Sequence, residues 1–87
     1  NIKLPNTIIN LELDTYFNKP IIIPDSVKNL QIGNHFNQPI ILPSQLEYLY
    51  LGWQFNQPII IPNTLKYLLF DSNSLFDQPI NIPSGVK

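Results

Sequence analysis

The chain has 87 residues, of which 44% are hydrophobic and 13% are charged, and its formal net charge is −1. A chain of this length forms a single domain, and the absence of cysteine excludes a disulfide framework and a thiolate metal site. The five lysines do not form the basic stripe that nucleic-acid binding requires, and no apolar run reaches the ~20 residues of a membrane-spanning helix.

A segment of eight residues recurs along the chain and sets its organisation. Residues 17–24, 36–43 and 55–62 share the pattern Phe-Asn-x-Pro-Ile-Ile-(Ile/Leu)-Pro, and residues 76–83 repeat it with Asp77 and Asn81 as replacements. Successive copies begin 19, 19 and 21 residues apart, and a fixed period near ~20 residues is typical of a solenoid. We therefore predict a single repeat domain over residues 1–87, with turns at 5–23, 24–42, 43–61 and 62–82. Partial units stand at both ends, so we expect either a segment of a longer array or a mature chain that lacks its start.

Each turn begins with a proline followed by the pattern Leu-x-x-Leu-x-Leu, with aliphatic or aromatic substitutes. Proline followed by Asn, Asp or Ser predicts a tight turn or a short 3₁₀ segment. The alternation that follows has period two and predicts a short strand. Because 19 residues leave no room for an ordinary helix as well, the predicted fold is mainly β, with little or no α-helix.

The segment between the two prolines of each copy must be extended, because proline fixes its own φ and restricts the residue before it. Asn81 replaces the middle Ile of the last copy, which predicts that the middle position faces water. The outer isoleucines are then expected to point inward. For the exposed stripe of Ile22, Ile41 and Ile60 we favour β-propensity with half-burial; a docking surface is the alternative. The predicted inward pairs are Ile21/Ile23, Ile40/Leu42, Ile59/Ile61 and Ile80/Ile82.

The outward positions of the strands should form two columns across neighbouring turns. The first column is Asn10, Asn29, Tyr48 and Tyr67, and the second is Glu12, Gln31, Tyr50 and Leu69. Since neighbouring strands lie ~4.8 Å apart, Tyr48 should touch Tyr67, and Trp53 should border the cluster. An exposed group of tyrosines and leucine is typical of a protein-binding hot spot. The alternative is that cross-strand aromatic pairs only stabilise the sheet.

The other polar residues favour structural roles. Asn18, Asn37, Asn56 and Asp77 fall at one position of the repeat, where a buried amide could satisfy backbone groups of the turn. His35 is the single histidine, has no partners at ligand spacing and is interpreted as a solvated loop residue. No nucleophile–base pair or glycine-rich phosphate loop occurs, so we expect no catalytic activity, no cofactor and no metal.

These motifs resemble the FNIP repeats, a group within the leucine-rich repeats that is found in arrays in social amoebae and large DNA viruses. The core of that repeat is matched at residues 17–24, 36–43 and 55–62, and its following (Leu/Val)-x-x-Leu-x-Leu-Gly pattern at 27–33, with Ile for the last Leu, and at 46–52. Asp14 and Asp71 stand where the matched units have Gly33 and Gly52, so a left-handed glycine is not obligatory there.

The resemblance implies a right-handed coil with a parallel sheet on one face. It also implies an interaction surface, in some relatives joined to an F-box or another ubiquitin-ligase adaptor; none is present in these residues. We therefore expect an intracellular, cytoplasmic scaffold that binds a protein through the concave strand face at Tyr48, Tyr50, Tyr67 and Leu69, with Asn29, Gln31 and Glu12 at the rim. A self-assembling array, joined end to end or through the isoleucine stripe, is the main alternative, and glycan binding is a weaker one.

Overall fold

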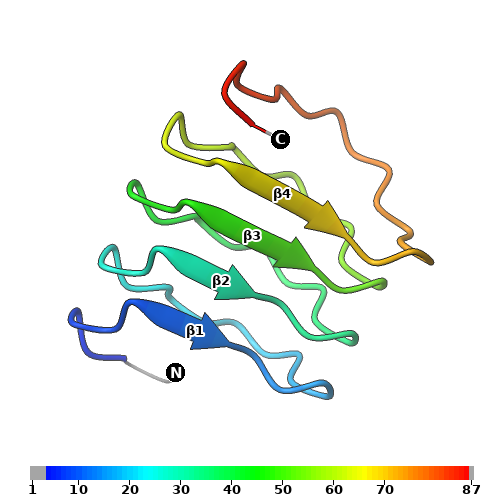
Figure 1. Ribbon diagram of the computed structural model, residues 1–87. Coiled ribbons are helices and arrows are strands. Elements are labelled where there is room, and N and C mark those ends of the chain that lie inside the picture. Colours follow the sequence, from blue (N-terminus) through cyan, green and yellow to red (C-terminus); the bar gives the residue numbers. More distant parts are fainter. Residues whose placement is uncertain (1–3, 87) are drawn as a thin grey trace.

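The computed structural model describes residues 4–86, which wind into a right-handed coil with one strand in each turn (Figure 1). The strands are β1 (Asn10–Glu12), β2 (Asn29–Gln31), β3 (Tyr48–Leu51) and β4 (Tyr67–Phe70). No helix occurs in this part of the chain, and consequently none that could span a membrane. The predicted mainly β fold is confirmed, and the short period explains it, because each turn has room only for one short strand and its connections.

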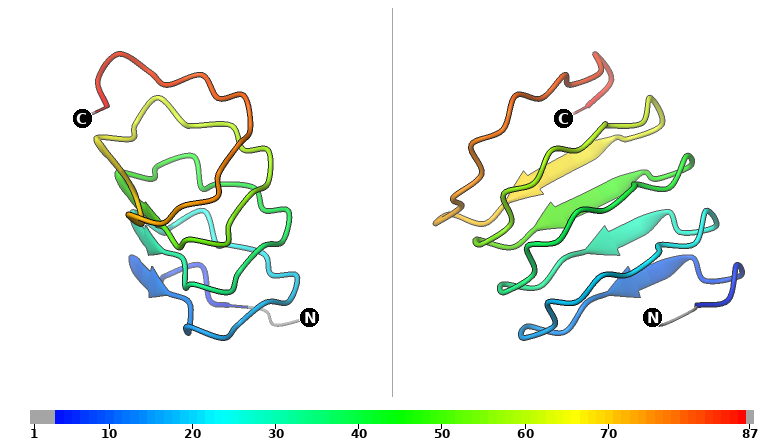
Figure 2. Two further views of the ribbon diagram at one scale, coloured as in Figure 1. Left: turned by 90° about the vertical axis from the view of Figure 1, so that its right-hand side faces the viewer. Right: turned by 180° about the vertical axis from the view of Figure 1, so that it is seen from behind.

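The four strands form one open, parallel sheet in the order β1-β2-β3-β4. Each residue pairs with the residue 19 positions further along the chain, as Asn10 does with Asn29 and Asn29 with Tyr48. The return segments run behind the sheet, so each turn contacts mainly the turns directly before and after it (Figure 2). The register therefore turns the sequence repeat into columns of equivalent side chains, as predicted.

Within each repeat, two short hydrogen-bonded loops change the direction of the chain. The first precedes the strand, where Val27 N–H donates to the Pro24 carbonyl oxygen at 3.2 Å and Leu46 N–H to that of Pro43 at 3.3 Å. The second follows the strand, where Phe36 N–H donates to the Gly33 carbonyl oxygen at 3.3 Å. The predicted proline turn is confirmed, since proline presets the backbone and the next polar residue favours a turn.

The glycines after β2 and β3 are required by close approach and not by a left-handed backbone. Among the described residues no glycine or other residue has a positive φ, which agrees with the expectation that a left-handed glycine is not obligatory here. A Cβ on Gly33 would instead collide with the Asp14 carbonyl oxygen, and one on Gly52 with the Gly33 carbonyl oxygen. At these two positions the backbone of the preceding turn leaves no room for a side chain.

The core is a single column of apolar side chains enclosed by the coil. In the third turn the six predicted inward residues are all buried: Leu46, Leu49, Leu51, Phe55, Ile59 and Ile61. The phenylalanines form a continuous stack with ring centroids 6.0–6.3 Å apart and planes within 7° of parallel; its members are Phe17, Phe36, Phe55 and Phe76. One turn cannot bury these rings alone, so neighbouring turns complete the core together.

The extended segments behind the sheet follow the predicted alternation, with two corrections. Ile82 was expected to point inward but is 53% exposed, because it lies in the last described turn and no further turn packs over it. The stripe of Ile22, Ile41 and Ile60 was expected to be half-buried, yet these side chains are 74%, 88% and 89% exposed. Neighbouring side chains do not cover them, since the flanking isoleucines turn to the core.

Candidate functional site

The outward columns of the sheet bring the predicted binding residues together. Tyr48 pairs with Tyr67 and Tyr50 with Leu69 across β3 and β4, while Glu12 pairs with Gln31 across β1 and β2. Tyr67 is 51% exposed and Leu69 is 42% exposed, and Tyr48 and Tyr50 are half-buried. The sheet face, defined as these two columns, is polar over β1 and β2 and aromatic or aliphatic over β3 and β4.

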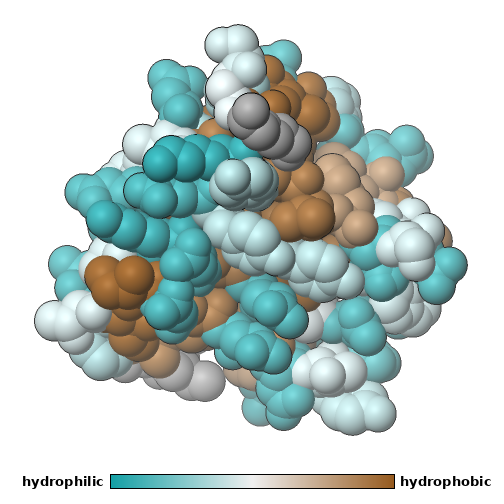
Figure 3. Space-filling view, viewed as in Figure 1, coloured by the Kyte–Doolittle hydropathy of each residue, from teal (hydrophilic) through white to brown (hydrophobic). Residues whose placement is uncertain are grey.

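Figure 3 views the molecule from this side, and apolar surface gathers around the end of β4. Phe70, at the end of β4, is also partly exposed and tilts against Phe76 with a centroid distance of 5.2 Å. Its register partner is the buried Leu51, so Phe70 belongs to the core side of the sheet and is partly exposed because it lies on the last strand.

Tyr48 and Tyr67 are register partners, as predicted, but they do not form one of the ring pairs found among the described residues. Within residues 4–86 the aromatic contacts run along the phenylalanine stack, between Phe70 and Phe76, and between Tyr16 and His35. The faces of the strand tyrosines are therefore not used in stacking with one another. This leaves aromatic surface available on the sheet face.

A hollow of about 360 Å³ lies on the sheet face toward the carboxyl ends of the first strands. Glu12 and Gln31 line one side of it, and Tyr48 and Tyr50 line the other. Thr15 and Asn34, from the turns after β1 and β2, also line the hollow; both were missed from the sequence. Thr15 and Asn34 stand at the same position of the repeat as Trp53. The reasoning that placed Trp53 beside the cluster could therefore have found them as well.

Trp53 occupies the next place in that column and is half-buried. Its carbonyl oxygen accepts from Leu75 N–H at 2.8 Å, which ties the third turn to the fourth. It is not among the residues that line the hollow. Trp53 therefore lies beside the sheet face at the level of β3, as part of its border.

Tyr50 carries the clearest electrostatic perturbation of the face. Partial desolvation raises the pKa of its phenol above the ordinary value, and the nearby Asp71 carboxylate raises that pKa further. Asp71 follows β4 and was treated in the sequence only as a substitute for glycine. Its carboxylate adds negative charge to the same side of the sheet.

Polar ladders along the other edges of the coil have structural roles. The Asn18 side-chain oxygen accepts from Asn37 N–H at 2.9 Å, and the Asn37 oxygen accepts from Asn56 N–H at 2.9 Å. The ladder continues as Asp77 N–H donates to the Asn56 side-chain oxygen at 2.9 Å. The predicted satisfaction of backbone groups is confirmed, although Asn18 and Asn37 are exposed and not buried.

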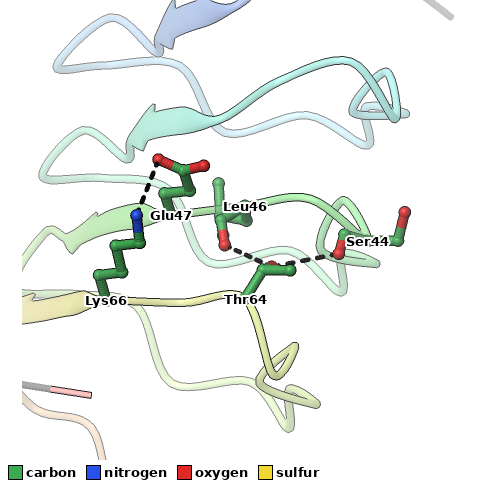
Figure 4. A network of polar contacts seen from close by, with 5 residues as sticks. All are labelled: Ser44, Leu46, Glu47, Thr64 and Lys66. Atoms are coloured by element: carbon green, nitrogen blue, oxygen red, sulfur yellow. Dashed lines mark hydrogen bonds and ion pairs between the residues drawn. The ribbon is translucent and has the colours of Figure 1, made fainter. Parts of the chain in front are cut away.

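A second set of polar contacts joins the turns before the strands (Figure 4). The Thr64 hydroxyl donates to the Leu46 carbonyl oxygen at 2.7 Å and to that of Ser44 at 3.1 Å. Lys66 and Glu47 form an exposed ion pair at 3.9 Å, which contributes ~0–1 kcal/mol. These contacts hold neighbouring turns in register, and among the described residues no buried side-chain polar atom lacks a hydrogen-bond partner.

His35 is more ordered than a solvated loop residue. Its Nδ1 lies 3.0 Å from the Thr15 carbonyl oxygen, and its ring packs on Tyr16 at a centroid distance of 4.8 Å. A carbonyl only accepts, so Nδ1 carries the proton. Over residues 4–86 there is no cluster of three or more His, Cys, Asp or Glu residues that could hold a metal ion.

Comparison with protein families matches the FNIP Repeat family over residues 1–35, 17–54 and 36–73. Comparisons with curated proteins and with solved structures gave no significant match. The family matches overlap by about one unit and together span residues 1–73, so they follow the repeats that the strands and the phenylalanine stack define. The chain belongs to the FNIP repeat family.

Proposed function

We propose that this chain is a protein-interaction scaffold that binds a protein partner through its sheet face. One observation carries the proposal: the parallel register gathers Tyr48, Tyr50, Tyr67 and Leu69 into one partly exposed cluster. Tyrosine offers a large contact area at a low entropy cost, which suits a binding hot spot. Asn29, Gln31 and Glu12 would supply polar contacts at the rim, as in other interfaces.

The face has no evident structural need for these side chains. Their rings do not stack on one another, and the sheet is held by backbone pairing, the buried leucines and the phenylalanine stack. Removing the tyrosines should therefore leave the fold intact. We also propose that the chain has no catalytic activity and binds neither nucleic acid nor a membrane.

The test is a pull-down from cell lysate with the native chain and the variant Tyr48→Ser/Tyr50→Ser/Tyr67→Ser, each checked by circular dichroism. The matched control is Ile41→Ser/Ile60→Ser, which removes apolar surface from the opposite side. We expect a partner that the native chain and the control retain and the tyrosine variant loses. Equal retention by all three chains would contradict the proposal, and so would unfolding of the tyrosine variant, which would make the tyrosines structural.

A second candidate function, self-association of the array, is favoured by the exposed isoleucine stripe. Ile22, Ile41 and Ile60 project from the side opposite the sheet face, and apolar grooves lie between their turns. The unpaired edges of β1 and β4 are a second route to assembly. Sedimentation at increasing concentration, with Ile41→Ser/Ile60→Ser for comparison, tests the stripe. A strict monomer at high concentration would exclude this function.

A further inference from the structure

The hollow on the sheet face exists because the outward columns change character between β2 and β3. The shorter polar side chains of Glu12 and Gln31 come from β1 and β2, and the larger rings of Tyr48 and Tyr50 come from β3. The side chains over β3 therefore project further from the sheet than those over β1 and β2. The volume of about 360 Å³ lies near the lower end of the range for ligand sites, which suits one side chain of a partner better than a cofactor.

The lining of the hollow favours a cation. Glu12 supplies an exposed carboxylate, and among the described residues no ion pair engages it. Gln31 and Asn34 offer amide oxygens, and Tyr48 and Tyr50 offer phenol rings. No lysine lines the hollow, and Lys66 is paired with Glu47 at the start of its strand. Acceptor groups, the two tyrosines and a carboxylate without an ion-pair partner among the described residues therefore surround the same space.

Asp71 strengthens this charge asymmetry from the neighbouring turn. Its carboxylate acts on the Tyr50 phenol, so the aromatic wall of the hollow has negative charge on both sides, from Glu12 and from Asp71. A cation that enters between them is attracted by both carboxylates. At ordinary ionic strength this attraction extends ~8–10 Å, which covers the width of a hollow that spans two to three strands.

Arginine meets these requirements better than lysine. Its planar guanidinium stacks on aromatic faces and donates two parallel hydrogen bonds to one carboxylate. Lysine offers only a compact, strongly hydrated point charge. A carboxylate opposite a tyrosine pair suits the planar group, since one of its sides can face the ring while its edge meets the carboxylate.

We propose that this hollow receives an arginine side chain of the protein partner, held by the Glu12 carboxylate and by the rings of Tyr48 and Tyr50. The inference rests on the proposed function, because it names the chemical group that the sheet face recognises. Tyr67 and Leu69, on the other side of Tyr48 and Tyr50, would then contact apolar residues near that arginine. The expected partner segment is basic and carries at least one apolar neighbour.

The first experiment is a heteronuclear NMR titration of the ¹⁵N-labelled chain with N-acetyl-arginine methylamide. The comparison probe is N-acetyl-citrulline methylamide, which has nearly the same shape and no charge. We expect saturable shifts confined to β1, β2, β3 and the turns after β1 and β2. The citrulline probe should bind about threefold to fivefold more weakly, the range that an exposed ion pair supports.

Two charge-matched variants make the test specific. Glu12→Gln removes the carboxylate of the hollow, whereas Glu47→Gln removes one that is paired with Lys66 outside it. We expect Glu12→Gln to weaken arginine binding by about threefold to fivefold and Glu47→Gln to leave it unchanged. Equal binding of both probes, equal loss in both variants, or shifts spread over all acidic residues would overturn the inference.

The outcomes also separate this inference from the proposed function. A partner whose capture depends on the three tyrosines but not on Glu12 would overturn the arginine site and leave the interaction scaffold in place. Arginine binding in the hollow without any tyrosine-dependent partner would contradict the scaffold instead, and would make the hollow a site for free guanidinium compounds. Both results can be obtained with the same folded variants.

Discussion

Glycine follows β2 and β3 because the distance between neighbouring turns is short there. The backbone there has an ordinary negative φ, so conformational freedom is not the reason for glycine. A methyl group on Gly33 would overlap the carbonyl group of the turn below it. Asp14 and Asp71 occupy the same position in the first and last described turns, so the requirement for glycine applies to the second and third turns.

We predict that Gly33→Ala and Gly52→Ala each lower the free energy of unfolding by ~1–3 kcal/mol, because the added methyl group forces neighbouring backbones apart. Chemical denaturation followed by circular dichroism measures this loss. Gly85→Ala is the matched control, since a Cβ there meets no atom within 4 Å. Equal effects at Gly33 and Gly85 would contradict the close-approach explanation.

Asp25 couples stability to pH. The backbone N–H of Ser44 and then the Ser44 hydroxyl, both at 2.8 Å, donate to its carboxylate and lower the pKa of Asp25 below its ordinary value. A folded-state pKa below the unfolded one stabilises the fold above the unfolded pKa of ~3.9. That contribution is lost as the pH falls through the lower, folded-state pKa.

We therefore predict that the native chain is more stable than Asp25→Asn at pH 6 and that this difference shrinks below pH ~4. Asparagine keeps one accepting oxygen, as Asn6 does toward Ser26 N–H at 3.2 Å, and it loses the charge. Urea unfolding of both chains between pH 6 and pH 3 measures the difference. A difference that stays constant with pH would show that Asp25 does not couple stability to pH.

At the scale of the element, equivalent hydroxyl groups link the second turn to the first and the fourth turn to the third. The third turn lacks this link to the second. The Ser26 hydroxyl donates to the Ile8 carbonyl oxygen at 2.7 Å, and the Thr64 hydroxyl donates to that of Leu46 at 2.7 Å. The third turn has Gln45 at this position. For a hydroxyl group at position 45, the equivalent acceptor would be the Val27 carbonyl oxygen.

We predict that Gln45→Thr stabilises the chain by about 0.5 kcal/mol, at the lower end of the range for one hydrogen bond because the site is exposed. This corresponds to a rise in Tm of ~2–4 °C for a domain of this size. Gln45→Val has the same shape without the hydroxyl and is the control. An equal rise for both variants would assign the gain to β-branching.

At the scale of the whole molecule, stability is distributed along the coil and not around a single centre. Each turn pairs only with its neighbours, and the most complete burial lies in the second and third turns, at Leu30, Phe36, Leu49 and Phe55. In the fourth turn, Phe70, Leu75 and Ile82 are exposed. A solenoid of this kind opens first where a turn has a neighbour on one side only.

We predict that the amides of β2 and β3 exchange with solvent at least about tenfold more slowly than the amides of residues 76–86. Native-state hydrogen exchange followed by NMR measures both groups in one sample. Phe55→Leu should lower protection in both groups, since this ring contacts the stack on both sides. Uniform exchange along the chain would instead indicate one cooperative unit.

The sequence by itself determined the period, the strand positions, the proline turns and most inward and outward side chains, because these follow from local alternation and from the repeat. It also placed the two outward columns, since a parallel register of 19 residues follows directly from the period. The candidate binding residues on those columns were found in this way.

The tertiary structure alone decided the features that depend on the spacing of stacked turns. These are the close approach at Gly33, the high exposure of Ile41, the exposure of Ile82, and the hollow between Glu12 and Tyr50. The physical reason is that local sequence sets the direction of each side chain. What covers that side chain depends on residues about one turn away and on whether a neighbouring turn is present.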